Sequence, residues 1–326
     1  MRLAGLLLVL VTLLFMVSLV IGRAPVTALH SLGALIFDDG TPLTVVMREI
    51  RLPRSLLAVM VGASLGLAGA AMQGYLRNPL AEPGLIGVSA SAALGAVLAL
   101  QSGLAAAFTL ALPMSALTTA LISVGLILAL AGPRGSSLTL ILAGIAISAL
   151  ASALTSLVLN LSPNPFAAAE IVFWMLGALS DRSFQHVWIA LPFMALGWAL
   201  LASLGRGLDA LTLGEDAAEA LGINMTALRL KLVVGTAACV GAATAVTGSI
   251  GFVGLVVPHI LRPFVGARPS ALLWSSALGG AAMVLAADIA VRVLLPERDL
   301  KLGVLMALIG APLFLHLIYK TRKELR

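Results

Sequence analysis

Ser64 is the residue whose surroundings come nearest to a catalytic pattern. The stretch GASLG at 62–66 fits the G-x-S-x-G spacing of hydrolase nucleophiles. In those enzymes the serine stands on a sharp strand-to-helix turn and has a histidine and an aspartate as partners. Here the pattern lies inside a long apolar run, which predicts the middle of a helix. We therefore expect Ser64 to be a packing residue and not a nucleophile.

The histidines and the single cysteine offer little metal or redox chemistry. His30, His186, His259 and His316 are scattered, and Cys239 stands alone in an apolar run. Neither a metal cluster nor a disulfide framework is therefore expected. The chain also lacks a Gly-Lys pair, and with it the G-x-x-x-x-G-K-[ST] phosphate loop. We therefore do not expect the chain to bind ATP through a phosphate loop of its own.

The composition places these residues in a membrane. Of 326 residues, 60% are hydrophobic and 10% are charged, whereas a soluble domain carries about 25% charged residues. The apolar runs are long and continuous, and backbone groups in lipid must be satisfied within their own segment. We therefore predict an all-α polytopic membrane protein and not a barrel. The pI of about 10.2 does not indicate nucleic-acid binding, because no basic-aromatic face accompanies it.

About ten helices are expected to cross the membrane, in a single domain over residues 1–326, because each span needs about 20 apolar residues. The predicted segments are 3–22, 54–76, 84–101, 105–131, 138–161, 187–205, 228–250, 271–294 and 302–319, with a shorter tenth at 252–265. We interpret 3–22 as the first span because it is long and has no clear cleavage site; a cleaved signal peptide is the alternative. An even number of spans places both termini on one side.

Lysine and arginine are unequally divided between the two sides. One predicted face carries twelve basic and six acidic residues, and the other carries eight and seven. Because basic loops stay in the cytoplasm, the richer face is predicted to be cytoplasmic. That face holds both termini and the turn LRNPLAEPG at 76–84.

Asp288 is the one acid that we expect within the membrane. An ion-coupled transporter usually carries several ionisable groups at that depth. Arg292 follows one helical turn later, so a structural ion pair is the favoured interpretation and a coupling-ion site is the alternative. The scarcity of buried acids argues against ion coupling.

A cytoplasmic loop at 206–227 contains an additional short helix. Gly214 precedes it, Glu215 and Asp216 lie in its first turn, where the helix dipole favours acids, and Gly222 ends it. Four residues are predicted to form one apolar face: Leu213, Ala217, Ala218 and Leu221. Such a face suits a groove in a partner protein. A helix lying on the membrane surface is the alternative.

Three arginines are predicted on the opposite side, against the orientation rule. Arg51 and Arg54 flank Pro53 just before one span, and Arg292 ends another. They could bind an acidic partner, or they could be anchors whose charged ends reach the lipid headgroups. The residues alone leave both interpretations open.

Two glycine-rich stretches predict closely packed helices. They are VGASLGLAGAAMQG and VGTAACVGAATAVTG, whose packing residues are Gly62, Gly66 and Gly69 in the first and Gly235, Gly241 and Gly248 in the second. The stretches resemble one another, and each precedes a Gly/Pro-broken segment. This hints at an internal repeat of the kind found in transporters.

Four longer motifs carry a resemblance to a known family. They are RLPRSLLAVMVGASLGLAGAAMQGYLRNPLAEPGLIGVSASAALGA, LTLGEDAAEALGI, GSIGFVGLVVPHILR and LGVLMALIGAPLF, and they occur in matching order between about residues 48 and 316. The chain resembles the FecCD family, the permease subunits of ATP-binding-cassette (ABC) importers for iron-siderophores, haem and cobalamin.

The resemblance implies a cobalamin-permease-like fold, that of a type II ABC importer, with ten transmembrane helices. It also implies a homodimer whose pathway follows the dimer axis, in contact with membrane lipid. The implied partners are two cytoplasmic ABC ATPases and a periplasmic or lipid-anchored substrate-binding protein. ATP and Mg would be bound by the ATPase, and this chain would bind no cofactor and no nucleic acid. The implied location is the bacterial inner membrane, with both termini cytoplasmic.

Site residues are also implied by the resemblance. The short helix corresponds to the coupling helix that rests on the ATPase, with contacts expected from Leu213, Gly214, Glu215, Ala218, Leu221 and Gly222. Docking of the binding protein is expected at positions that salt-bridge its glutamates, here Arg51, Arg54 and Arg292. A cytoplasmic gate is expected from Asn78, Pro79 and Leu80 with Ser136 and Ser137.

The gate turn also has a physical basis. Two prolines stop one helix and begin the next, and the Asn78 side chain can bond backbone groups left free there. The chain departs from the family pattern at Lys301, where proline is common, and at GARP, 266–269, which replaces Gly-x-Asp-His-Arg. Together these features predict the permease of an ATP-driven metal-chelate importer that performs no chemistry itself. An ion-coupled secondary transporter is the alternative.

Overall fold

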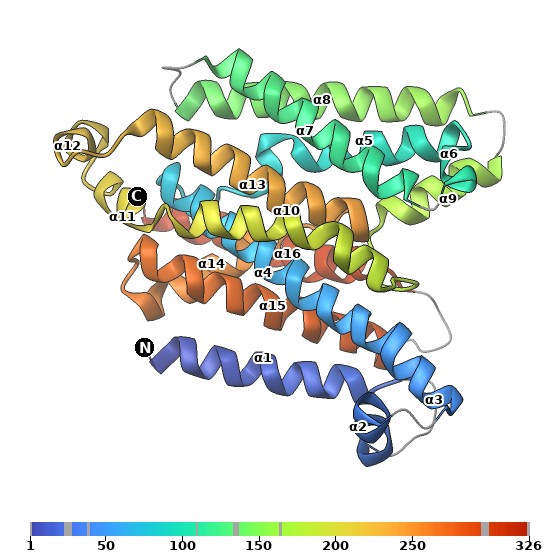
Figure 1. The fold of residues 1–326 in the computed structure, drawn as a ribbon. Coiled ribbons are helices and arrows are strands. Elements are labelled where there is room, and N and C mark those ends of the chain that lie inside the picture. Colours follow the sequence, from blue (N-terminus) through green and yellow to red (C-terminus); the bar gives the residue numbers. More distant parts are fainter. Residues whose placement is uncertain are drawn as a thin grey trace.

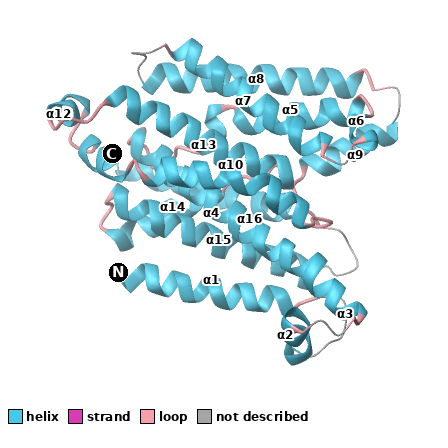
Figure 2. Ribbon diagram, in the orientation of Figure 1, coloured by secondary structure: helices cyan, strands magenta, loops and turns pink. Residues whose placement is uncertain are grey.

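The computed structural model describes residues 2–22, 28–37, 40–108, 110–132, 137–162, 165–294 and 300–324. These residues form helices, turns and loops, with the long helices side by side (Figures 1 and 2). The first half contains α1 Arg2–Val20, α2 Ala28–Ile36, α3 Pro42–Val45, a π-helix Val46–Arg51, α4 Leu52–Tyr75, a 3-10 helix Pro83–Ile86, α5 Val88–Gln101, α6 Leu104–Ala107, α7 Ala111–Ala131 and α8 Ser137–Asn160. The second half contains α9 Pro165–Met175, α10 Phe184–Ala202, α11 Gly205–Leu211, α12 Glu215–Ala220, α13 Met225–Thr247, α14 Val253–Leu261, a 3-10 helix Arg262–Val265, α15 Pro269–Leu294 and α16 Leu302–Glu324.

The ten predicted apolar segments correspond to ten helices in the described part of the chain. Seven are long and apolar enough to cross a membrane, and α5, α14 and α16 supply the shorter apolar helices. The predicted start of one segment is wrong. Residues 105–131 are not one helix, because α6 ends at Ala107 and α7 begins at Ala111.

Helices α4 and α13 form the centre of the bundle. In each, 83% of the apolar window is buried, against 17% for α1 and 28% for α8. A helix that is apolar all round must lie either within protein or against lipid. The outer helices fit the second case, since α8 exposes leucines along its length, such as Leu142 and Leu157.

The glycine face of α4 packs directly on α15. A Cβ atom at Gly62 would overlap the carbonyl oxygen of Gly280, and one at Gly66 would overlap that of Ser276. Gly69 meets Gly254 of α14 in the same way. These contacts confirm the predicted small-residue face, and they require glycine because the two backbones touch.

The two ends of the bundle carry different elements. Helices α11 and α12 lie at one end, where α1 begins and α16 ends, while α2, α3, α6 and α9 lie at the other (Figure 1). We call them the α12 end and the α9 end. The sharing of one end by the start of α1 and the end of α16 agrees with the predicted even number of spans.

Helices α5 and α14 cross only part of the bundle. The 14 residues of α5 reach about 21 Å, less than the roughly 30 Å of a hydrocarbon core. A broken stretch precedes each helix, residues 76–87 before α5 and 248–252 before α14. These stretches follow the two look-alike glycine segments, and they lie against each other, since the N–H of Phe252 donates to the Glu82 carboxylate.

Candidate functional site

Helix α12 stands beyond the ends of the long helices (Figure 1). It begins after Gly214, whose φ is +108°, and is followed by Gly222, whose φ is +83°. Both values favour glycine, because a Cβ atom is strained in that region. The predicted short helix is therefore confirmed, with glycines at both ends.

The apolar side chains of α12 do not share one face, so that part of the prediction is wrong. Leu213 is 70% exposed and Leu221 is 62% exposed, whereas Ala218 is fully buried. The small Ala218 side chain packs into the hydrophobic core and holds α12 against the bundle. Of the expected contact residues, the two leucines and the exposed Glu215 can meet a partner, and Ala218 supports the helix from behind.

Asp209 of α11 fastens this region to the start of α15. Its carboxylate accepts hydrogen bonds from the Ser270 N–H at 2.8 Å, the Ser270 hydroxyl at 2.7 Å and Arg268 Nε at 2.9 Å. Burial acts to raise the pKa of Asp209, but these bonds from Ser270 and Arg268 outweigh it and hold the pKa below its usual value. Arg268, in the divergent GARP segment, thus has a defined partner.

The turn after α4 is closed by its own backbone and by Asn78. Arg77 has a φ of +48°, and the N–H groups of Arg77 and Asn78 bond back to the carbonyls of Gly74 and Gln73. The Asn78 side chain then accepts the N–H of Leu80 at 2.9 Å. This confirms that Asn78 satisfies a backbone group in the turn. The gating role of Asn78, Pro79 and Leu80 stays a prediction.

The second part of the expected gate lies at the start of α8. Ser137 is the first residue of that helix, and Ser136 lies outside the described residues. Gly132, which ends α7, is held by Arg229 of α13, whose Nη2 donates to the Gly132 carbonyl at 2.7 Å. Arg229 is one of the twelve basic residues predicted on the cytoplasmic face, yet it is 6% exposed.

At the α9 end, Asp288 binds two arginines. Arg292 Nη2 lies 2.8 Å from Asp288 Oδ2, which confirms the predicted ion pair one turn apart. Arg54 adds a second pair that was not foreseen, through Nε at 3.0 Å and Nη2 at 2.8 Å from Oδ1. Asp288 is 1% exposed, so its charge is neutralised inside the bundle.

The third docking arginine is turned inwards. Arg51 is 6% exposed, and its guanidinium donates to the carbonyls of Leu19 and Val20 at the end of α1. Arg292 likewise donates to the carbonyl of Ser18 at 2.8 Å. The C-terminal end of a helix carries partial negative charge, which these cations offset. The docking role stays a prediction, and Arg51 does not reach the surface in this structure.

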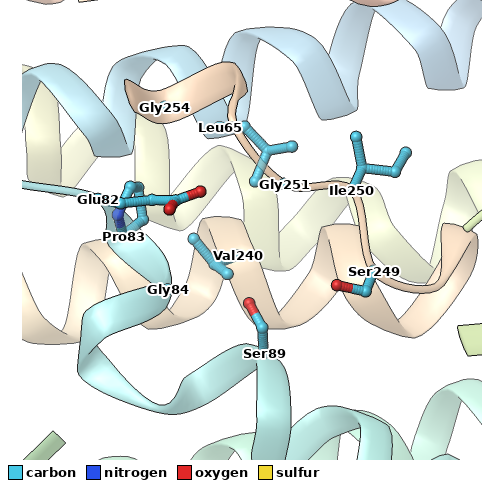
Figure 3. A pocket seen from close by; sticks show the side chains of 10 residues that line it. All are labelled: Leu65, Glu82, Pro83, Gly84, Ser89, Val240, Ser249, Ile250, Gly251 and Gly254. Atoms are coloured by element: carbon cyan, nitrogen blue, oxygen red, sulfur yellow. The ribbon is translucent and has the colours of Figure 1, made fainter. Parts of the chain in front are cut away.

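Glu82 is a half-buried acid that was not among the predicted site residues. It was expected in a water-facing turn, with Asp288 as the one acid within the membrane. Its carboxylate instead points, with the hydroxyls of Ser89 and Ser249, into a cavity of about 130 Å³ between the two broken stretches (Figure 3). Oε1 accepts the N–H of Phe252, the residue that caps the start of α14, at 2.9 Å. An acid between two prolines in an apolar setting was the available signal.

Gln73 joins α4 to α14 nearer the α12 end. It is 1% exposed, its Nε2 donates to the Leu255 carbonyl at 3.2 Å, and its Oε1 accepts from Arg262 at 2.6 Å. Ser64, further along α4, is buried and accepts a hydrogen bond from Trp198 Nε1 at 2.8 Å. Ser64 therefore lies in a helix and packs, as predicted.

The divergent Lys301 lies over an aromatic ring. Its Nζ is 5.7 Å from the centre of the Phe173 ring in α9, within the range of a cation–π contact. Lys301, at a position where the family pattern commonly has proline, thus links the start of α16 to α9.

Comparisons with known proteins match this arrangement over nearly the whole chain. Residues 8–320 match the FecCD transport family. The chain is 37% identical to the cobalamin import system permease protein BtuC of Halobacterium salinarum, over 93% of this chain and 81% of that protein. It is also 37% identical to the hemin transport system permease protein HmuU of Yersinia pestis, over 96% of this chain and 95% of that protein.

A solved structure agrees in three dimensions. It is an inward-facing conformation of a transporter assigned to the metal-chelate type of ABC transporters. It superposes with a TM-score of 0.86 at 35% identity and covers 98% of this chain and 99% of that one. With this fold and these relatives, the chain belongs to the FecCD transport family, as a multi-span membrane permease of the ABC importer type.

Proposed function

We propose that this chain imports a metal chelate, namely an iron-siderophore, haem or cobalamin, across the bacterial inner membrane. It acts as a homodimer with two cytoplasmic ABC ATPases, which bind ATP and Mg, and with an external substrate-binding protein. The α12 end faces the cytoplasm, and the chain itself catalyses no reaction. The names of relatives that carry cobalamin or hemin support this substrate class.

The observation that carries the proposal is α12 itself. Its two leucines are exposed at the end of the bundle that also holds most of the basic loops, while Ala218 and Asp209 fix the region to the core. A short helix that is anchored on one side, exposes acids on the other and is flanked by two exposed leucines suits a cleft in a cytoplasmic partner.

The ion-coupled alternative has less support. Asp288 already binds Arg54 and Arg292, so it lacks the free charge that a coupling cation requires. Replacing Asp288 by Asn would favour that alternative only if ATP-driven uptake disappeared while the assembled complex still hydrolysed ATP.

Uptake into liposomes tests the proposal directly. The chain is reconstituted with its ATPase, binding protein and ATP are supplied, and haem, a ferric siderophore and cobalamin are offered in parallel. We expect one of them to accumulate, and accumulation to stop without ATP. No uptake of any, in a complex whose ATPase responds to the binding protein, would contradict the metal-chelate assignment.

The coupling role of α12 has its own test. Replacing Glu215 and Leu221 together by Ala should weaken co-purification of the ATPase, because both side chains are exposed on α12. Leu121→Ala is the matched control, since Leu121 is 57% exposed on α7. An unchanged complex with unchanged ATPase activity would remove the coupling assignment.

The docking role of the arginines needs a variant that leaves the net charge of the cluster unchanged. Arg54→Gln combined with Asp288→Asn removes both charges of one ion pair. We expect the binding protein to stimulate the ATPase less in this double variant. Full stimulation would mean that Arg54 serves only to hold α4 to α15.

A further inference from the structure

Arg229 lies where the loop that carries α12 enters the membrane-spanning bundle. Residues 221–224 join α12 to α13, and Asn224 caps α13 by accepting the N–H of Ala227 at 2.9 Å. Arg229 follows just after this cap. Because the cap makes the start of α13 continuous with the connection from α12, a displacement of α12 moves the backbone that carries Arg229.

The Arg229 side chain reaches from α13 to the end of α7. Its Nη2 donates to the Gly132 carbonyl at 2.7 Å, and the side chain is 6% exposed. A cation on a C-terminal helix carbonyl is favoured both as a charged donor and by the helix dipole. In the sequence, residues 133–136 then connect Gly132 to Ser137, the first residue of α8.

The helix that carries Arg229 also packs against α4. Tyr75, the last residue of α4, is 6% exposed and directly precedes the turn that contains Asn78. Helix α13 therefore contacts the helix that ends at the predicted gate turn.

A cavity beside Arg229 makes its bond more significant. About 270 Å³ lies next to the side chain, lined also by Leu128, Gly132, Thr226 and Leu230. At this level the pocket leaves the Arg229 side chain as the group that bridges α13 to the end of α7. Its hydrogen bond is therefore a direct path for displacement between the two helices.

We propose that Arg229 is a positioning residue that links movement of α12 to the end of α7. When the partner ATPase displaces α12, the guanidinium carries the Gly132 carbonyl, and with it the end of α7, in the same direction. The inference rests on the proposed function, because it assigns the transmission between the coupling helix and the gate to one side chain.

The test compares three variants in liposomes that contain the complete complex. Arg229→Met removes the hydrogen-bond donor and the charge but keeps a side chain of similar length. Arg229→Lys keeps the charge and supplies an ammonium donor. Lys231→Met is the control. Lys231 is exposed two positions along the same helix, so its loss removes an equal charge without touching α7. ATP hydrolysis stimulated by the binding protein and substrate uptake are measured in the same preparation.

We expect Arg229→Met to keep ATP hydrolysis within about twofold while uptake falls by about tenfold, the typical worth of a charged hydrogen bond. Arg229→Lys should restore most of the uptake, and Lys231→Met should match the unaltered chain. An unchanged ratio of ATP hydrolysed to substrate moved in Arg229→Met would overturn the inference. So would an equal fall in both activities, which indicates a purely structural role.

The same experiment separates the two levels of the proposal. If the unaltered chain moves no substrate, the proposed function fails. If the unaltered chain transports and Arg229→Met keeps its ratio, the proposed function stands and only the role of Arg229 is lost. Should Arg229→Met fail to assemble, Arg229→Gln, which also removes the charge, takes its place in the same comparison.

Discussion

Asp288 and its two arginines are expected to respond unequally to substitution. Asp288→Asn keeps the shape of the side chain and removes its charge, which leaves Arg54 and Arg292 as two cations without their common anion. Arg54→Met is milder, because Asp288 keeps Arg292 at 2.8 Å. The asymmetry follows from one carboxylate serving two guanidinium groups.

The size of the effect follows from burial. Asp288 is 1% exposed, and the side chains of Arg54 and Arg292 are 18% and 12% exposed. Removing one partner of a buried pair costs about 3–5 kcal/mol, and the partial exposure of the arginines places this case near 3 kcal/mol. Arg54→Met loses one charged hydrogen-bonding partner, or about 1.5 kcal/mol. The melting temperature should fall by roughly 6 °C and 3 °C respectively.

Thermal unfolding of the purified protein in detergent measures both variants. Glu49→Gln is the control, since Glu49 is an exposed acid just before the same cluster in sequence. A larger loss for Arg54→Met than for Asp288→Asn would refute this account of the cluster. So would an Asp288→Asn variant that melts with the control.

Three further results are expected. Asp209→Asn should destabilise the protein at pH 7. Because the folded pKa of Asp209 is lowered, its contribution to stability is present above about pH 4 and is lost as the pH falls through the folded value. The melting curves of the variant and the unaltered chain should therefore converge in acid. Glu82→Ala should cost about 1 kcal/mol of stability by removing the acceptor for the Phe252 N–H. Glu82→Gln keeps an acceptor and should melt at a temperature nearer that of the unaltered chain. Equal losses of stability in the two variants would show that the charge matters and not the hydrogen bond. Gly66→Val should abolish the folded protein in detergent, because its side chain would enter the backbone of α15, and a soluble, correctly melting variant would contradict that packing.

Features that depend on neighbours in sequence were predictable. The glycines around α12 lie within a few residues of the helix that they bound, and Asp288 and Arg292 lie one turn apart on α15. The spans could be located because their apolar length is set by the bilayer. Each of these signals is carried by the segment that it describes.

The interior contacts could not be predicted in this way. Arg54 and Asp288 are 234 positions apart, Glu82 and Phe252 are 170 apart, and Arg229 and Gly132 are 97 apart. A charge in a turn gives no sign of which helix it will meet, so Glu82 and Arg229 were assigned to a water-facing surface. The split of the α12 face was missed for the same reason, since Ala218 is buried by the bundle and not by α12 itself.

The contact between α4 and α15 has a mechanical consequence. With carbonyl oxygens resting where Cβ atoms would otherwise be, at Gly62 and Gly66, neither helix can slide past the other or rotate without backbone overlap. The pair must therefore tilt as one stiff lever, with Arg54 near one end of α4 and the Asn78 turn just beyond the other. Over the 24 residues of α4, about 36 Å, a tilt of 5° displaces the far end by roughly 3 Å. A small tilt of the two helices about the arginine end would thus shift the Asn78 turn by about the width of a water molecule, without a hinge.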